Sequence, residues 1–254
     1  MDALNEQVDK GIQILKQGGV IAFPTDTVYG LGADAFNSNA VKRIYDIKKR
    51  PKHLPLPLLI GDIKQLDILA EPLSEIALFL AKRFWPGGLT LVVPKAARLP
   101  GYLGNTNIAV RIPAHPVCLA LIQAINNPII GTSANISGRP SALTAGEVRQ
   151  QLGNEVDLII DGGRCPGGGE STVVDVTGGE VVILRQGIIP EDEINRALEE
   201  LGSLHSHPST SSGEGNSPLP SLSRRGRGVA KNVLPGKYGG RELEGGGKEP
   251  CGLL

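Results

Sequence analysis

The composition of this chain changes abruptly near Gly202, and this change limits how much of the chain can fold. Residues 203–254 hold 11 glycines, 8 serines and 5 prolines among 52 residues. A segment of this kind cannot bury enough apolar surface to offset the entropy that it would lose on ordering. We therefore predict one folded domain over residues 1–202, large enough for a substantial core, and a disordered tail over residues 203–254.

Short apolar runs and segments of helical periodicity follow one another along the predicted domain. The spacing of Val8, Ile12 and Leu15, for example, indicates a helix that is ended by two glycines. We predict helices over residues 8–15, 40–49, 76–84, 117–125, 144–152 and 190–201, and strands over residues 20–23, 56–60, 89–93, 108–112, 129–130, 158–160, 172–176 and 181–184. Helices interspersed with strands, and a hairpin near the end, indicate an α/β fold on a mixed sheet.

The formal net charge of zero is divided unevenly along the chain. The tail carries 7 Lys and Arg against 4 Glu, so residues 1–202 carry 19 basic and 22 acidic side chains, a net charge of −3. This balance argues against a nucleic-acid binder that is basic throughout, and it leaves a local basic cleft open.

The cysteines and the apolar runs restrict the compartment. Cys118, Cys165 and Cys251 stand far apart, and no histidine lies at metal-ligand spacing from them. A disulfide framework or a zinc site is therefore not expected, and a reducing compartment fits. The first residues lack the pattern of a secretory signal, and no apolar run approaches membrane-spanning length. We expect a cytoplasmic protein that makes no membrane contact.

Two polar segments follow predicted elements of the first quarter of the chain. Residues 24–32 read Pro-Thr-Asp-Thr-Val-Tyr-Gly-Leu-Gly and suit the close approach of a small polar ligand. A well-capped turn without a ligand explains the same residues equally well. Lys48-Lys49-Arg50-Pro51 ends a helix, where a solvated last turn is the ordinary interpretation. An extended Lys-x-Arg segment would send the side chains of Lys48 and Arg50 the same way, which suits a polyphosphate.

Two arginines end apolar strands. Arg111 lies within Ile-Ala-Val-Arg-Ile, where an unpaired guanidinium would carry a desolvation penalty, so it needs an anion. That anion is either an internal Asp or Glu or a substrate carboxylate. Arg185 repeats the pattern after Val-Val-Ile-Leu. Strand ends are where open α/β sheets bind their ligands.

Short polar side chains complete the candidates. Ser133 and Asn135 follow an apolar strand without a Gly-x-Ser-x-Gly elbow, so they suit either contacts with phosphate or ribose or a plain strand-exit turn. Ser171 follows Gly-Gly-Gly-Glu. Three interpretations of this segment are open: a lid, an anion nest or a loose loop. No histidine is placed for general-base catalysis, so positioning and charge neutralisation, as in nucleotidyl transfer, are favoured.

Six motifs in series resemble the YrdC/YciO/TsaC family. They lie at residues 24–32, 48–51, 85–90, 110–113, 133–138 and 170–175, and the match runs from about residue 8 to about residue 190. The resemblance implies a twisted mixed open sheet with helices on both faces around a large basic concave site. It also implies a nucleotidyltransferase, L-threonylcarbamoyladenylate synthase, which joins L-threonine, bicarbonate or CO2 and ATP with Mg²⁺ and releases pyrophosphate. Its product feeds a separate tRNA threonylcarbamoyl transferase complex that makes N6-threonylcarbamoyladenosine.

The resemblance also assigns roles to residues of this chain. Lys48 and Arg50 would meet the triphosphate as the catalytic pair. The implied ATP contacts are Lys48, Arg50, Asn107, Ser133, Asn135, Ser141 and Arg185, and the implied L-threonine contacts are Thr27, Arg111 and Ser171. Arg111 would hold the threonine carboxylate, and no residue is assigned as a metal ligand. Residues 162–170 are the candidate lid.

The chain departs from the longer members of that family in two ways. Those members place a histidine just past the Lys-x-Arg loop, whereas residues 55–60 here contain none. They also carry a second C-terminal domain, which the tail cannot form. The alternative function is a non-catalytic YciO-like protein that binds double-stranded or structured RNA. The net charge of −3 counts against it, because affinity for a phosphate backbone needs many cations, and weak RNA binding is the most that we expect.

Overall fold

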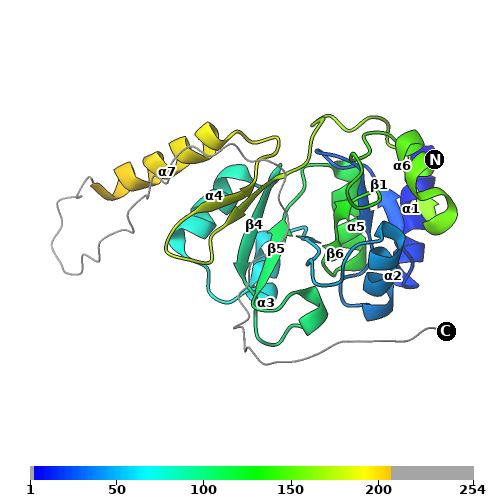
Figure 1. Cartoon of the computed structure of the whole chain (residues 1–254), viewed down its shortest axis with the longest axis horizontal. Helices are drawn as coiled ribbons and strands as arrows, with labels where there is room; N and C mark the ends of the chain where they lie inside the picture. The colour runs from blue at the N-terminus through cyan, green and yellow to red at the C-terminus, as the bar shows by residue number, and fades with distance from the viewer. Residues whose placement is uncertain (1–2, 207–254) are drawn as a thin grey trace, which may run out of the picture. The chain divides into compact units, whose positions relative to one another are not determined.

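The computed structural model describes residues 3–206 (Figure 1). The α-helices are α1 (Ala3–Lys16), α2 (Ser38–Lys48), α3 (Leu66–Leu69), α4 (Glu75–Phe84), α5 (Pro116–Ile125), α6 (Ala145–Leu152) and α7 (Glu191–Ser206). Short 3-10 turns are η1 (Ile63–Gln65), η2 (Gly101–Leu103) and η3 (Gly153–Glu155). Within the described range, no helix is both long enough and apolar enough to span a membrane.

The strands form two mixed sheets, which confirms the predicted fold class. One sheet has the order β7-β2-β1-β8 and consists of β7 (Thr132–Ser133), β2 (Gly30–Gly32), β1 (Ile21–Phe23) and β8 (Leu158–Ile159). The other has the order β10-β9-β4-β5-β3-β6 and consists of β10 (Val182–Arg185), β9 (Thr172–Asp175), β4 (Leu89–Pro94), β5 (Asn107–Arg111), β3 (Leu58–Leu59) and β6 (Ile129–Ile130). An isolated bridge between Asp34 and Ile129 joins the two sheets.

Each sheet contains both parallel and antiparallel pairs. The pairs β1–β8, β3–β5 and β4–β9 are parallel, whereas β9 and β10 form the predicted antiparallel hairpin. Its register shifts between Ile183 and Arg185, a bulge that re-aims the side chain at the end of β10.

Helices cover the sheets and enclose the core. α1 packs on α5, and α4 packs on α7 (Figure 1). Tyr29, Phe23 and Leu58 are among the largest fully buried side chains. Burial of such apolar surface is the main favourable term in folding, and it fixes the strand ends that carry the site.

Local capping explains where two helices begin. The Asn37 side chain accepts a hydrogen bond from the Ala40 amide at 3.1 Å and caps α2, and Thr144 accepts one from the Glu147 amide at 3.2 Å and caps α6. The residue types predict both caps, the first within residues 37–39 and the second at Thr144. The last helix runs past the predicted domain end at residue 202 to Ser206, and the rest of the predicted tail, 207–254, lies outside the described residues.

Candidate functional site

Lys48 anchors the end of α2 to the turn that follows β7. Its Nζ donates to the main-chain oxygens of Ser133 and Asn135, the second at 2.8 Å, and to Oδ1 of Asn135 at 3.2 Å. The residue is only 2% exposed. Burial, with the neighbouring positive charge of Arg50, lowers the pKa of Lys48 to about 7. The sequence prediction therefore holds in that Lys48, Ser133 and Asn135 lie together.

Arg50 reaches the same place by a route that the sequence did not predict. The expected extended Lys-x-Arg segment is wrong, because Lys49 adopts the left-handed conformation (φ 51°) that ends α2. The Arg50 guanidinium then donates to the carbonyls of Leu54 and Pro55, each at 3.2 Å. Burial and the charge of Arg185 lower the pKa of Arg50. Lys48, Arg50 and Arg185 thus form one group, which we call the cation cluster.

Arg185 brings the third charge into the cation cluster from the end of β10. Its Nη1 pairs with Oε2 of Glu170 at 2.5 Å, and its Nη2 donates to the Ser171 carbonyl at 2.9 Å and to Ser171 Oγ at 3.1 Å. Ser141 donates its hydroxyl to the other carboxylate oxygen of Glu170 at 2.5 Å. Glu170, which the sequence did not single out, therefore joins Ser141 to Arg185, and Arg185 in turn contacts Ser171.

Arg111 is held by a separate buried network. Its Nη2 pairs with Oδ1 of Asp26 at 2.5 Å, its Nη1 donates to Thr27 Oγ1 at 2.8 Å, and its Nε donates to the Gly87 carbonyl at 2.8 Å. The residue is 5% exposed. Of the two anions that the sequence left open, the structure shows the internal carboxylate. These contacts use three of the five N–H donors of a guanidinium.

The start of β4 joins the cation cluster to the Arg111 network. The Gly87 carbonyl accepts from Arg111, and the next carbonyl, of Gly88, accepts from the Thr172 amide at 3.0 Å. Thr90 then shares a hydrogen bond of 2.8 Å with the hydroxyl of Ser171. Two polar groups separated widely in sequence thus flank one strand end, as ligand sites of open α/β sheets do.

The matching family model, described as "Telomere recombination", is that of Sua5, YciO and YrdC, and it covers residues 13–187. The chain belongs to this family. The match confirms the resemblance that the six motifs carry.

Relatives within the family share a large part of the chain. It is 46% identical over 196 residues to a threonylcarbamoyl-AMP synthase of Pyrococcus abyssi and 43% identical over 202 residues to one of Bacillus subtilis, alignments that cover 76% and 78% of this chain. They cover 57% and 58% of those proteins, so the chain spans little more than half of their length. The crystal structure of P. abyssi Sua5 complexed with L-threonine superposes with a TM-score of 0.73 at 42% identity, covering 81% of this chain and 62% of that one.

Asn107 is the one predicted site residue that lies apart from the others. It begins β5 and pairs with Pro94, at the far end of β4 from Gly87 and Gly88. Arg111 ends the same strand, about 13 Å away at the usual rise per residue. The position assigned to Asn107 by the family resemblance therefore receives no support from the contacts of this site.

Asp26 and Glu170 are residues of the candidate site that sequence reasoning missed. Both lie inside motifs that it quoted, at 24–32 and 170–175. A buried arginine needs an acid, and Asp26 is an acid in a polar segment directly after a buried strand. For Asp26, that requirement was a signal that the sequence offered. For Glu170 there was no such signal, because nothing in the sequence pairs it with Arg185.

The candidate lid, residues 162–170, is tethered over the Arg111 network. Tyr29 donates its hydroxyl to the Gly163 carbonyl at 2.8 Å, and burial raises the pKa of Tyr29 to about 12, so it remains a neutral donor. The Cys165 amide donates to the Leu143 carbonyl at 2.9 Å. A Cβ on Gly167 would lie 2.4 Å from the Asp26 carbonyl, so only glycine allows this approach. Whether the segment closes over a ligand stays a prediction.

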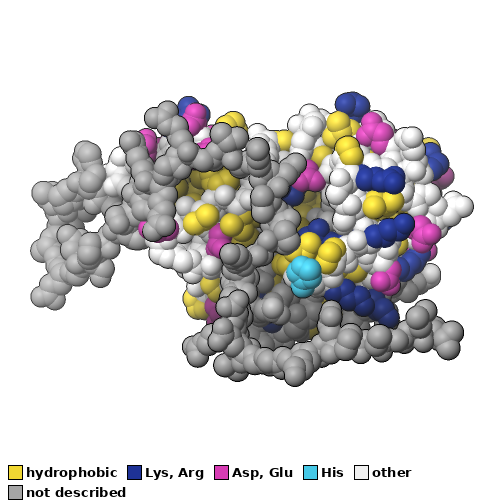
Figure 2. All heavy atoms as spheres, viewed as in Figure 1, with side chains coloured by type: hydrophobic (Ala, Val, Ile, Leu, Met, Phe, Trp, Pro, Cys, Tyr) yellow, Lys and Arg dark blue, Asp and Glu magenta, His cyan; other side chains and the backbone are white. Residues whose placement is uncertain are grey.

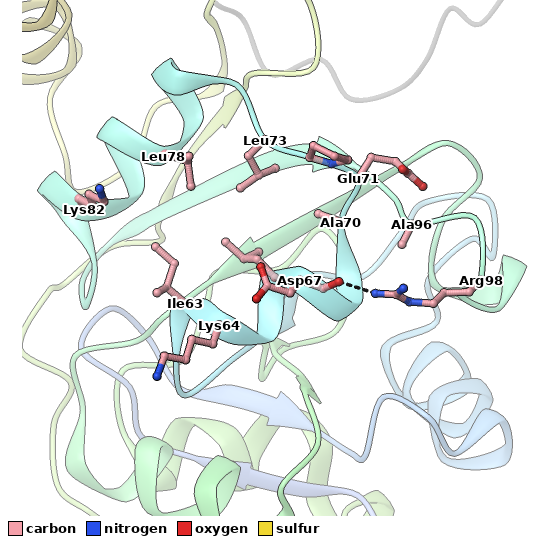
Figure 3. Close-up of a pocket in the computed structure, with 12 residues that line it drawn as sticks. Ile63, Lys64, Asp67, Ala70, Glu71, Leu73, Leu78, Lys82, Ala96 and Arg98 are labelled. Carbon is pink, nitrogen blue, oxygen red and sulfur yellow. Dashed lines mark hydrogen bonds between the residues drawn. The ribbon is translucent and has the colours of Figure 1, made fainter.

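A groove of about 690 Å³ lies elsewhere in this family member, between η1–α3 and α4 (Figure 3). Leu73 and Leu78 point into it, and Arg98 bonds the Asp67 carbonyl at its edge. None of the predicted site residues lines this groove. The lining mixes apolar residues with charged ones, and the groove is separate from the strand ends that carry the predicted site residues.

Proposed function

We propose that this chain is a threonylcarbamoyl-AMP synthase, which joins L-threonine, bicarbonate or CO2 and ATP and releases pyrophosphate. The observation that carries the proposal is the cation cluster beside a buried arginine network at one strand end. The names of the P. abyssi and B. subtilis relatives and the L-threonine complex of P. abyssi Sua5 support it.

The cation cluster is the proposed triphosphate site. Lys48, Arg50 and Arg185 meet the phosphates, and Ser133, Asn135 and Ser141 add polar contacts around them. Mg²⁺ enters with ATP as part of the substrate, held by phosphate oxygens as is usual for this ion beside nucleotides. Because the pKa of Lys48 in the free protein is about 7, binding of a polyanion near neutral pH raises it and takes up a proton.

The Arg111 network is the proposed L-threonine site. The donors of Arg111 that are not used by Asp26, Thr27 and Gly87 are available to the threonine carboxylate. Thr27 and Ser171 supply hydroxyls on the two sides of the β4 start. The contact between Ser171 and Arg185 supports a threonine site beside the proposed phosphate site.

The proposed chemistry runs in two steps. The threonine amine attacks CO2 and loses a proton, which forms an N–C bond and a carboxylate. An oxygen of that carboxylate attacks the α-phosphorus, the bond from this phosphorus to the bridging oxygen breaks, and pyrophosphate leaves. The cation cluster neutralises charge that develops on the phosphates, and proximity supplies much of the remaining acceleration.

Pyrophosphate release tests the proposal directly. Purified protein with MgATP and bicarbonate should release pyrophosphate with L-threonine, and far less with L-serine or with no amino acid. Arg50→Ala should abolish this release while circular dichroism and thermal melting stay unchanged. Release that is independent of threonine would contradict the proposal.

RNA binding is the competing function, and one observation bears on it. Lys and Arg side chains lie over the α2 and α6 side of the view in Figure 2 with Asp and Glu side chains among them. Such mixed charge suits weak contacts with RNA better than a strong backbone site. Folded protein that releases no pyrophosphate but shifts a structured RNA in a gel would favour this function instead.

The proposed product defines the partner and the compartment. A threonylcarbamoyl adenylate is a mixed anhydride, so a transferase must take it up before water does. We propose the tRNA threonylcarbamoyl transferase complex as this consumer, and the cytoplasm as the place where both act.

A further inference from the structure

Glu170 occupies an unusual position within the cation cluster. Both of its carboxylate oxygens are engaged, Oε2 by Arg185 at 2.5 Å and Oε1 by the Ser141 hydroxyl at 2.5 Å. Charge-assisted contacts of this kind are the strong ones, and phosphate oxygens make the same contacts with the same donors. The carboxylate therefore fills the coordination that an anionic ligand would use.

The charge of Glu170 also acts on the two other cations. Burial and mutual repulsion lower the pKa of Lys48 and of Arg50, and the negative charge of Glu170 opposes that lowering for both residues. One carboxylate thus partly neutralises three converging cations. A bound polyphosphate would bring several negative charges to the same place and would repel Glu170.

The backbone at Glu170 is fixed, whereas its side chain has room to move. Its carbonyl accepts from the Ile188 amide at 3.0 Å, and a Cβ on Gly187 would lie 2.3 Å from that carbonyl. The side chains of Glu170 and Arg185 are 33% and 40% exposed. The carboxylate can therefore rotate toward solvent without a change in the backbone that holds it.

We propose that the Glu170 carboxylate is an internal substitute for a substrate phosphate, which a polyphosphate must displace from Arg185 and Ser141 when it binds. Glu170 thereby weakens polyphosphate binding and keeps the cluster assembled in the free protein. This inference rests on the proposed function, in that it takes the cation cluster as the phosphate site.

Calorimetric titration with inorganic triphosphate tests the inference. Glu170→Gln keeps the shape of the side chain and removes its charge, so triphosphate should bind about tenfold more tightly than to the wild type. Asp9→Asn is the matched control, since it makes the same charge change on the exposed face of α1 and should alter affinity less than about twofold. Equal or weaker binding by Glu170→Gln would overturn the inference, because it would mean that the carboxylate positions Arg185 for the ligand.

Two further results separate this inference from the proposed function. A wild type that binds no triphosphate would overturn the inference together with the phosphate site. The synthase proposal would then be tested separately, and threonine-dependent pyrophosphate release would still support it. Thermal melting checks that Glu170→Gln is folded. If it is not, Glu170→Ala takes its place with the same expected gain in affinity.

Discussion

Arg111 and Arg185 both end an apolar strand, yet the structure treats them in opposite ways. Arg111 is 5% exposed and pairs with Asp26, with further contacts to Thr27 and Gly87. The Arg185 side chain is 40% exposed and pairs with Glu170, which is itself 33% exposed. The same residue type at the same point of a strand is largely buried in an internal network in one case and partly exposed to solvent in the other.

This difference shows that ion-pair distance alone does not indicate what an arginine does. Both pairs measure 2.5 Å. Breaking a buried pair leaves an uncompensated charge inside the protein, whereas the remaining charge of a broken exposed pair is solvated by water. We therefore expect mutations of Arg111 to lower stability in addition to disturbing the proposed threonine site, and mutations of Arg185 to act mainly on binding.

The largest expected effect is that of Arg111→Met. Asp26 would be left as a buried charge without its partner, so the free energy of unfolding should fall by about 3–5 kcal/mol in urea titrations. Asp26→Asn should also destabilise, and the double variant should recover part of the loss. A loss below about 1 kcal/mol for Arg111→Met would remove the contrast between the two arginines.

Arg185→Ala should have a smaller effect, and on a different quantity. We expect kcat/KM for ATP to fall on the order of 100-fold, or about 2.7 kcal/mol, while the free energy of unfolding changes by no more than about 1 kcal/mol. Steady-state kinetics and urea titration of the same preparation measure both. A loss of stability as large as that for Arg111→Met would show that Arg185 is structural as well.

Lys48 extends the comparison to a cation that is buried but has carbonyl partners in place of an acid. Its folded-state pKa of about 7 lies below the ordinary lysine value of 10.5, so between these values the unfolded chain holds a proton that the folded chain has lost. Stability should therefore rise with pH across this window, and relative to Lys48→Met the gain should be about 1–2 kcal/mol between pH 7.5 and 9. Unfolding titrations at several pH values measure it, and parallel pH curves for the two proteins would contradict the lowered pKa.

Arg43→Ala should have the smallest effect. Arg43 pairs with Asp157 at 2.5 Å, and the two side chains are 41% and 33% exposed, close to the values for Arg185 and Glu170. We expect a stability loss below about 1 kcal/mol and unchanged pyrophosphate release. Arg43 and Arg185 share their exposure and ion-pair distance and differ in location. A loss of activity in Arg43→Ala would therefore mean that the location of Arg185 at a strand end does not explain its role.

The predictions from sequence succeeded where the signal is local. Asn37 and Thr144 are caps that can be recognised from the residue type before an amphipathic segment, and the hairpin of β9 and β10 follows from two apolar runs around Gly178 and Gly179. The family and the mixed α/β fold were also predicted, because six motifs in order are a strong signal even when each is short.

The predictions failed where distant parts of the chain decide the local structure. β2 is Gly-Leu-Gly, which has little strand propensity, and it forms because it is paired on both sides and because Phe23 packs where a side chain on Gly32 would lie. The left-handed Lys49 was missed, since few residues other than glycine adopt that conformation. The choice of Asp26 as the partner of Arg111 is likewise set by the packing of segments 85 residues apart.

The long sequence separations within the site have a consequence for how the protein is made. Lys48 bonds a carbonyl that lies 87 residues further along the chain, and Arg185 arrives only with the last strand. A ribosome must therefore deliver β10 before the three charges can be brought together, and contacts between such distant segments form late in folding. We expect every nascent chain that ends before β10 to lack the cluster, so that the proposed ATP site forms only after Arg185 has been added.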